Sequence, residues 1–153
     1  MKGNVLELQN RTKEAQDNYR QALQNNPDND FAANNLAYLL AEDGRDLQSA
    51  LNWAQAVRKR HPDDPHAADT LGWVYYKLGR LIQAREQGVF AVSKEPDNGV
   101  MQYHLGVIYK ANNERDLAEK ALKKAAASAN FKDKGLAEEA LKEIYRWRSL
   151  VKP

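Results

Sequence analysis

The 153-residue sequence lacks cysteine entirely. Disulfides and thiolate metal sites are therefore excluded, while a reducing cytosol and a periplasm are both compatible with the composition, so the localisation stays open. No apolar run approaches the roughly 18 residues that a membrane-spanning helix needs. Glu7 interrupts the apolar stretch that a signal peptide would require. We expect a soluble chain with no direct membrane insertion.

A large excess of one charge is also missing, since 23 Lys and Arg face 21 Asp and Glu. This balance removes the strong positive field of a dedicated nucleic-acid binder. The densest basic run is 58–61, which reads Arg-Lys-Arg-His. It has two interpretations, a contact to nucleic acid or phospholipid and the neutralisation of a helix C-terminus, and we favour the second because cations offset the negative end of the helix dipole. We expect no nucleic-acid partner.

Motifs for catalysis, metal binding or nucleotide binding are absent. The three histidines, His61, His66 and His104, form no HExxH or His-x-x-x-His pattern, and the glycines form no GxxxxGK[ST] loop. Asp69 lies near His66 in the sequence without a serine nucleophile at motif spacing. We expect no enzymatic activity, no metal and no cofactor.

The main feature that is present is a repeat. The dipeptides Leu36-Ala37, Leu71-Gly72 and Leu105-Gly106 recur after 35 and 34 residues, and Ala15, Ala50, Ala84 and Ala118 recur after 35, 34 and 34. A period of this length predicts a solenoid of stacked supersecondary units. Such solenoids present a long curved surface that commonly binds another protein.

Each unit reads as two helices, because the apolar residues within it have helical spacing. Gly44, Gly79 and Asn113 lie where the two helices meet, and these residue types tolerate the left-handed conformation that ends a helix. Proline-containing segments at 26–29, 61–65 and 95–98 separate the units. There the proline stops one helix, and an Asp or Asn caps the next.

The pattern resembles the tetratricopeptide repeat (TPR), whose signature is W-x2-L-G-x2-Y, then A-x3-F, then P within 34 residues. Three units match it, through Leu71, Gly72, Tyr75, Ala84 and Pro96, through Leu105, Gly106, Tyr109 and Ala118, and more loosely through Leu36, Ala37, Leu40, Ala50 and Pro62. The phrases NNLAYLLAEDGRDLQSALNWA and DTLGWVYYKLGR resemble those of bacterial TPR proteins. The resemblance implies an all-α, right-handed α-solenoid of helix-turn-helix units, with Gly72 and Gly106 allowing close helix approach.

We expect a single TPR domain over residues 1–153. It consists of a partial repeat at about 1–29, repeats at about 30–64, 65–98 and 99–132, and a capping helix at about 133–150. In the partial repeat, a complete second helix follows the stub of a first one. Val5, Leu6 and Leu8 would then expose an apolar end that a preceding repeat normally covers, so we expect a fragment of a longer array that self-associates through this end.

The capping helix reads as amphipathic. Its apolar positions predict an inward face made of Leu136, Ala140, Leu141, Ile144 and Tyr145. Polar residues at 138, 139, 142 and 146 would then face the solvent, as expected for the end of a solenoid.

Helical geometry also predicts which residues of the first helices face away from their partner helices. In TPR proteins these first helices line the concave face, so the resemblance assigns such residues to a peptide-binding groove. The expected groove residues are Asn34, Tyr38, Glu42, His66, Asp69, Trp73, Tyr76, Lys77, Tyr103, His104, Val107 and Lys110. Its aromatics suit interface anchors, although Trp73 and Tyr76 could instead fill the space between neighbouring first helices.

Together these features favour a non-enzymatic scaffold that binds a peptide or protein segment in the groove. Two alternatives stay open, a targeting or regulatory arm of a larger enzyme such as a transferase, and a self-assembly module. One TPR subgroup grips peptide carboxylates with Lys, Asn and Arg side chains, but Asn34, Tyr38, Thr70, Val100 and His104 occupy those positions here. A chaperone-tail adaptor is therefore not expected.

Overall fold

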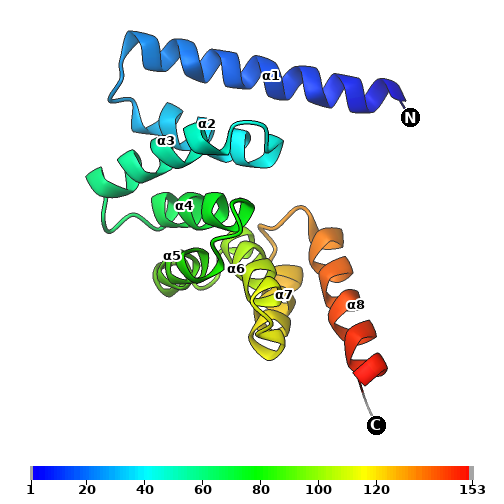
Figure 1. The fold of residues 1–153 in the computed structure, drawn as a ribbon. Coiled ribbons are helices and arrows are strands. Elements are labelled where there is room, and N and C mark those ends of the chain that lie inside the picture. Colours follow the sequence, from blue (N-terminus) through cyan, green and yellow to red (C-terminus); the bar gives the residue numbers. More distant parts are fainter. Residues whose placement is uncertain (1, 152–153) are drawn as a thin grey trace.

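The structure is a computed structural model of the chain, and it describes residues 2–151, with side chains from residue 8 onward. This part of the chain is entirely helical. Its helices are α1 (Lys2–Asn25), α2 (Asp30–Asp43), α3 (Leu47–Arg60), α4 (Pro65–Lys77), α5 (Leu81–Lys94), α6 (Gly99–Ala111), α7 (Arg115–Ala127) and α8 (Lys134–Val151). Successive helices pack against each other in antiparallel pairs along the array (Figure 1). The predicted all-α helical-repeat solenoid is confirmed.

The helix ends follow the capping residues seen in the sequence. The side chains of Asn29, Asp64 and Asn98 each accept a hydrogen bond from a backbone N–H in the first turn of the following helix. Gly44 and Gly79 have φ of 77° and 75°, and Asn113 has φ of 66°. The predicted left-handed turns between the paired helices are therefore confirmed.

Two glycines allow the helices of a pair to approach closely. A Cβ added at Gly72 would lie 3.2 Å from the carbonyl oxygen of Ala84, and one added at Gly106 would lie 2.7 Å from Cγ of Leu122. Because Leu122 is completely buried, it has no free space into which to move. This close approach agrees with the expectation drawn from the sequence.

Helix α1 differs from the expectation. The sequence predicted the stub of one helix followed by a separate second helix, but α1 is one continuous helix of 24 residues. No proline or glycine follows Gly3 within this segment. Because the residues at the expected turn are compatible with a helix, the helix is not interrupted there. Of the expected apolar end, Leu8 is 64% exposed, while the side chains of Val5 and Leu6 lie outside the described residues.

Helix α8 is rotated relative to the predicted inward face. Ala137, Ala140, Leu141 and Ile144 are buried, as expected for the last three. The placement of Leu136 and Tyr145 in that face was wrong, because they are 53% and 43% exposed. A helix of this composition has apolar residues on more than one stripe, and only contact with α6 and α7 decides which stripe is buried.

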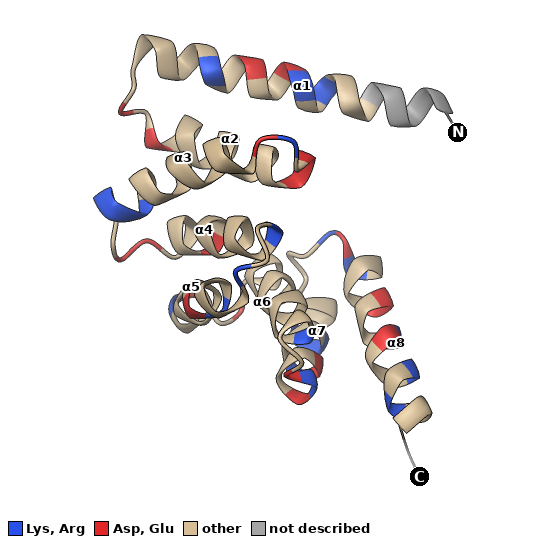
Figure 2. Ribbon diagram, viewed as in Figure 1, with Lys and Arg blue, Asp and Glu red and all other residues tan. Residues whose placement is uncertain are grey.

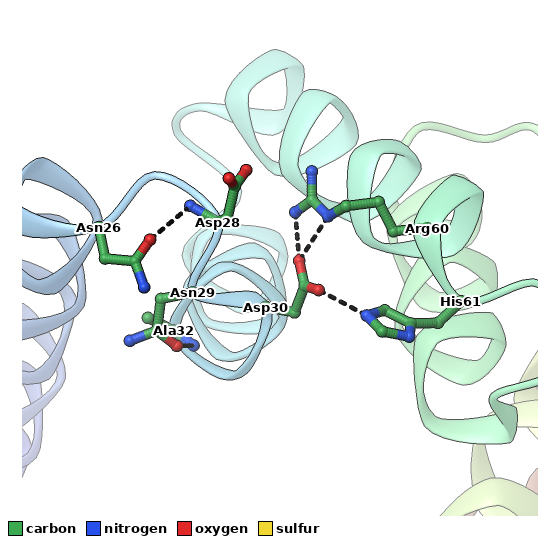
Figure 3. A network of polar contacts seen from close by, with 7 residues as sticks. All are labelled: Asn26, Asp28, Asn29, Asp30, Ala32, Arg60 and His61. Atoms are coloured by element: carbon green, nitrogen blue, oxygen red, sulfur yellow. Dashed lines mark hydrogen bonds and ion pairs between the residues drawn. The ribbon is translucent and has the colours of Figure 1, made fainter.

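The basic run at 58–61 ends α3 and is used within the fold. The Arg60 guanidinium and His61 Nε2 both contact the carboxylate of Asp30 at the start of α2, with His61 Nε2 2.5 Å from Asp30 Oδ2 (Figure 3). Arg58 Nε donates to Gln87 Oε1 on α5 over 2.8 Å, and its guanidinium lies over the Phe90 ring. The structural interpretation of this run is therefore supported by its contacts.

The first helices of the pairs form a continuous layer. Within the described residues α2 contacts α4, α4 contacts α6, and α6 contacts α8. The second helices α3, α5 and α7 make no comparable contacts with each other. Helices that touch on one side and spread on the other bend the stack, so the layer of α2, α4, α6 and α8 is the inner side. We call it the inner layer.

Candidate binding surface

The centre of the inner layer is a stacked pair of rings. The ring centroids of Trp73 on α4 and His104 on α6 lie 4.3 Å apart, with an interplanar angle of 28°. Trp73 is 5% and His104 3% exposed. The sequence assigned both residues to the groove, but at this burial their own contact area for a ligand is small. They join neighbouring repeats and support the residues around them.

Each ring of this pair is hydrogen-bonded to a carboxylate. The Trp73 indole Nε1–H donates to Glu42 Oε1 at the end of α2. His104 Nδ1 lies 2.9 Å from Asp69 Oδ1 and 3.0 Å from Oδ2, and since a carboxylate only accepts, the ring nitrogen donates. Polar atoms of both buried rings are thereby satisfied, which fixes the orientation of the stack.

Three tyrosines lie next to the stacked pair, one each from α2, α4 and α6. Tyr38 of α2 lies 5.8 Å from His104 between centroids, Tyr76 of α4 lies 4.8 Å from Trp73, and Tyr103 of α6 lies 6.4 Å from Trp73. All three tyrosines are partly exposed. We refer to these five residues as the aromatic cluster.

The charges near the tyrosine hydroxyls are negative. Burial raises the pKa of Tyr38, and the carboxylates of Glu42, Asp69 and Asp133 raise it further. Burial also raises the pKa of Tyr103, again with contributions from Glu42 and Asp133. These hydroxyls therefore stay protonated at neutral pH, in a form that can donate a hydrogen bond. Elsewhere α4 carries little charge and is mostly tan in Figure 2, whereas α8 carries charged side chains of both signs.

Comparison with known proteins assigns this architecture to a family. Sequence models described as tetratricopeptide repeat match residues 1–65 and 100–131. The chain belongs to the tetratricopeptide repeat family. It is 31% identical over 102 residues to TPR repeat-containing protein PA4667 of Pseudomonas aeruginosa, an alignment that covers 67% of this chain and 17% of the relative. The chain therefore spans about a sixth of the length of that protein.

Solved structures, one of them a thermophilic TPR protein, have the same fold. TTC0263 of Thermus thermophilus superposes with a TM-score of 0.78 at 26% identity, covering 95% of this chain and 79% of that one. MamA of Desulfovibrio magneticus superposes with a TM-score of 0.65 at 21% identity over 86% and 73% of the two chains. A chain of the CopN-Scc3 complex superposes with a TM-score of 0.56 at 20% identity, covering 85% of this chain and 75% of that one. TPR arrays are repeat scaffolds for protein interaction, and the chain shares this architecture.

The other predicted groove residues differ in their surroundings. The Lys77 ammonium lies over the Trp73 ring, 5.4 Å from its centroid, while Val107 is partly buried against the core. Lys110 contacts Glu143 of α8. Asn34 is partly buried, and its Oδ1 lacks a hydrogen-bond partner. His66 lies apart, in the first turn of α4, with Nε2 3.2 Å from Glu95 Oε1.

Sequence reasoning missed two residues and one pairing at this surface. Phe131, just before α8, stacks on Tyr103 with centroids 5.4 Å apart, and Asp133 follows it. Both precede the capping helix, where the repeat signal has faded. The step between these two units is 34 residues, so the equivalent of Asp69 is Tyr103. His104 lies one position further along, and the repeat spacing did not reveal its pairing with Asp69.

Other kinds of site are not apparent in the described residues. No group of three or more His, Cys, Asp or Glu side chains is arranged to hold a metal ion there. In the same part of the chain no helix combines the length and the apolar character needed to cross a membrane. A depression of about 560 Å³ lies between α1 and the end of α2, and Glu42 forms part of its wall.

Proposed function

We propose that this TPR segment is a non-enzymatic scaffold that binds a protein or peptide segment on its inner layer. The observation that carries the proposal is the presence of partly exposed Tyr38, Tyr76 and Tyr103 on three successive inner helices. Tyrosines offer a large amphipathic contact area for little loss of side-chain entropy, and they are enriched among residues that dominate binding energy.

The proposal gives the groove residues two roles. The buried Trp73 and His104, with Asp69, hold the surface in shape, because they are enclosed and hydrogen-bonded. The residues that meet the ligand are then the more exposed ones, namely Asn34, Tyr38, Glu42, Tyr76, Lys77, Tyr103, Val107 and Lys110, with His66 at the margin. Rigid support beneath a contact surface lowers the entropy cost of binding.

The experiment is an affinity capture that uses this chain as bait, with bound proteins identified by mass spectrometry. A variant carrying Tyr76→Ala and Tyr103→Ala should lose a partner that the unchanged chain captures. The matched control carries Ile82→Ala and Val89→Ala, which remove exposed apolar side chains from α5 on the outer side. Loss of the same partner from both variants, or from neither, would contradict binding on the inner layer.

We propose self-association through α1 as a second candidate. It is supported by Ala15, which is partly exposed, while the equivalent Ala50, Ala84 and Ala118 are fully buried by the first helix of their own pair. Helix α1 contacts α2 but has no first helix of its own within the described residues. Light scattering tests the idea, because a strict monomer at high protein concentration would contradict it.

A further inference from the structure

We propose that the aromatic cluster binds a basic side chain of the bound segment, with arginine preferred over lysine. The inference rests on the proposed function and names the chemistry of its partner. Its basis is the group of partly exposed Tyr38, Tyr76 and Tyr103 with two carboxylates nearby. Glu42 is hydrogen-bonded to the Trp73 ring, and Asp133 follows two residues after Phe131, which stacks on Tyr103. Aromatic faces and carboxylates are the two groups that recognise a guanidinium together.

Glu42 has a fixed position beside the aromatic cluster. Its Oε1 accepts the hydrogen bond from the buried Trp73 indole, so the carboxylate is held at the edge of the aromatic cluster. Glu42 is itself exposed, and no cationic partner contacts its second oxygen among the ion pairs of the described residues. It can therefore accept further hydrogen bonds from a ligand.

Asp133 supplies a second carboxylate near the aromatic cluster. Phe131 stacks on Tyr103, which brings the segment before α8 alongside the cluster. The carboxylate of Asp133 is close enough to raise the pKa of both Tyr38 and Tyr103. The carboxylates of Glu42 and Asp133 both act on these two tyrosines, so negative charge lies near the cluster and favours a cation there.

A cation of the chain itself already lies on this cluster. The Lys77 ammonium is 5.4 Å from the centroid of the Trp73 ring. Lys77 is exposed and lies on a flexible stem, so a ligand can displace it. A guanidinium suits the remaining surface better than an ammonium, because it is planar, stacks on tyrosine rings and donates two parallel hydrogen bonds to a carboxylate.

The test uses three small probes and the indole N–H signal of Trp73 in a ¹H–¹⁵N spectrum. That signal is assigned by its loss in Trp73→Phe. Acetyl-arginine amide should shift it in a saturable manner at millimolar concentrations. Acetyl-citrulline amide has nearly the same shape without the charge, and acetyl-glutamate amide has the opposite charge. A response to citrulline or glutamate equal to that to arginine, or no response to arginine, would overturn the inference.

Charge variants provide the second arm. Glu42→Gln keeps an acceptor for the Trp73 N–H and removes the charge, and combined with Asp133→Asn it should weaken arginine binding at least tenfold. The matched control combines Glu86→Gln with Asp63→Asn, which remove two exposed carboxylates on α5 and in a linker. If both pairs of substitutions weaken arginine binding equally, or if neither pair weakens it, binding at the aromatic cluster is contradicted.

The same variants separate this inference from the proposed function. Suppose that a captured partner is lost from the Tyr76→Ala, Tyr103→Ala variant but is bound at full affinity by the Glu42→Gln, Asp133→Asn variant. This result leaves the scaffold function intact and overturns the binding of a basic side chain at the aromatic cluster. A partner unaffected by the tyrosine changes overturns the proposed function itself.

Discussion

Trp73 and His104 stack with their ring centroids 4.3 Å apart, although they are 31 residues apart in the sequence and belong to different repeats. One ring is hydrogen-bonded to Glu42 of the preceding repeat and the other to Asp69 on α4. Three inner helices are thereby connected through side chains at a single place. The stack is thus both a joint between repeats and the base of the candidate binding surface.

Changes at Trp73 should separate packing from hydrogen bonding. Trp73→Ala removes a large buried ring, and we expect it to lower the free energy of unfolding by about 3–5 kcal/mol. Trp73→Phe keeps an aromatic ring and loses the N–H that binds Glu42, so a cost of about 1–2 kcal/mol is expected. Urea denaturation monitored by circular dichroism measures both, and equal costs would contradict the described burial.

A second prediction concerns the close approach of α6 and α7. Gly106→Ala places a Cβ 2.7 Å from Cγ of the buried Leu122, and overpacking of this kind costs about 1–3 kcal/mol. Gly135→Ala is the matched control, because no atom lies within 4 Å of its added Cβ. The control should be neutral or stabilising by up to about 1 kcal/mol, since alanine favours helix. Thermal unfolding of the two variants tests the contrast.

The third prediction tests the orientation of α8. Ile144 is 1% exposed, so Ile144→Ala should cost about 2–4 kcal/mol of stability. Leu136 is 53% exposed, and Leu136→Ala should change stability by less than about 0.5 kcal/mol. Comparable losses for the two variants would restore the inward face inferred from the sequence and contradict the structure.

A fourth prediction concerns pH and the Asp30 contacts of Figure 3. Hydrogen bonding to Arg60, with a further contribution from His61, lowers the pKa of Asp30 below 3.8. A lowered carboxylate pKa stabilises the fold above the unfolded pKa, and this stabilisation disappears as the pH falls through the folded pKa. Asp30→Asn should therefore cost about 1 kcal/mol at pH 7, and the difference from the unchanged chain should shrink below pH 4.

Denaturant unfolding at pH 7, 5, 4 and 3 checks this dependence. Asp63→Asn is the control, since Asp63 is exposed in the linker before α4. A difference between Asp30→Asn and the unchanged chain that persists undiminished at pH 3 would contradict an ion-pair origin.

Much of the fold could be predicted because its signals are local and periodic. Gly44, Gly79 and Asn113 mark left-handed turns by residue type alone, and the small Gly72 and Gly106 indicate where helices approach closely. The continuity of α1 could not be predicted in this way. The repeat spacing predicted a break there, but the local sequence favours helix throughout, and one continuous helix forms.

The candidate site was predictable in its location but less so in the exposure of its members. Spacing placed Tyr38, Trp73 and Tyr103 on the same side of the first helices, and the structure brings them together. Spacing does not reveal how closely neighbouring repeats pack, and that distance determines which rings become buried. Trp73 and His104 lie between repeats and are enclosed, while the tyrosines at their edges keep partial exposure.

The central claim is that the inner layer binds a protein segment through its partly exposed tyrosines. Isothermal titration calorimetry with a purified captured partner tests it most directly. Tyr76→Ala with Tyr103→Ala should weaken binding by about 2 kcal/mol or more, roughly 30-fold, while circular dichroism shows a folded chain. Ile82→Ala with Val89→Ala should leave the affinity unchanged. Unaltered affinity in the folded tyrosine variant would contradict the account.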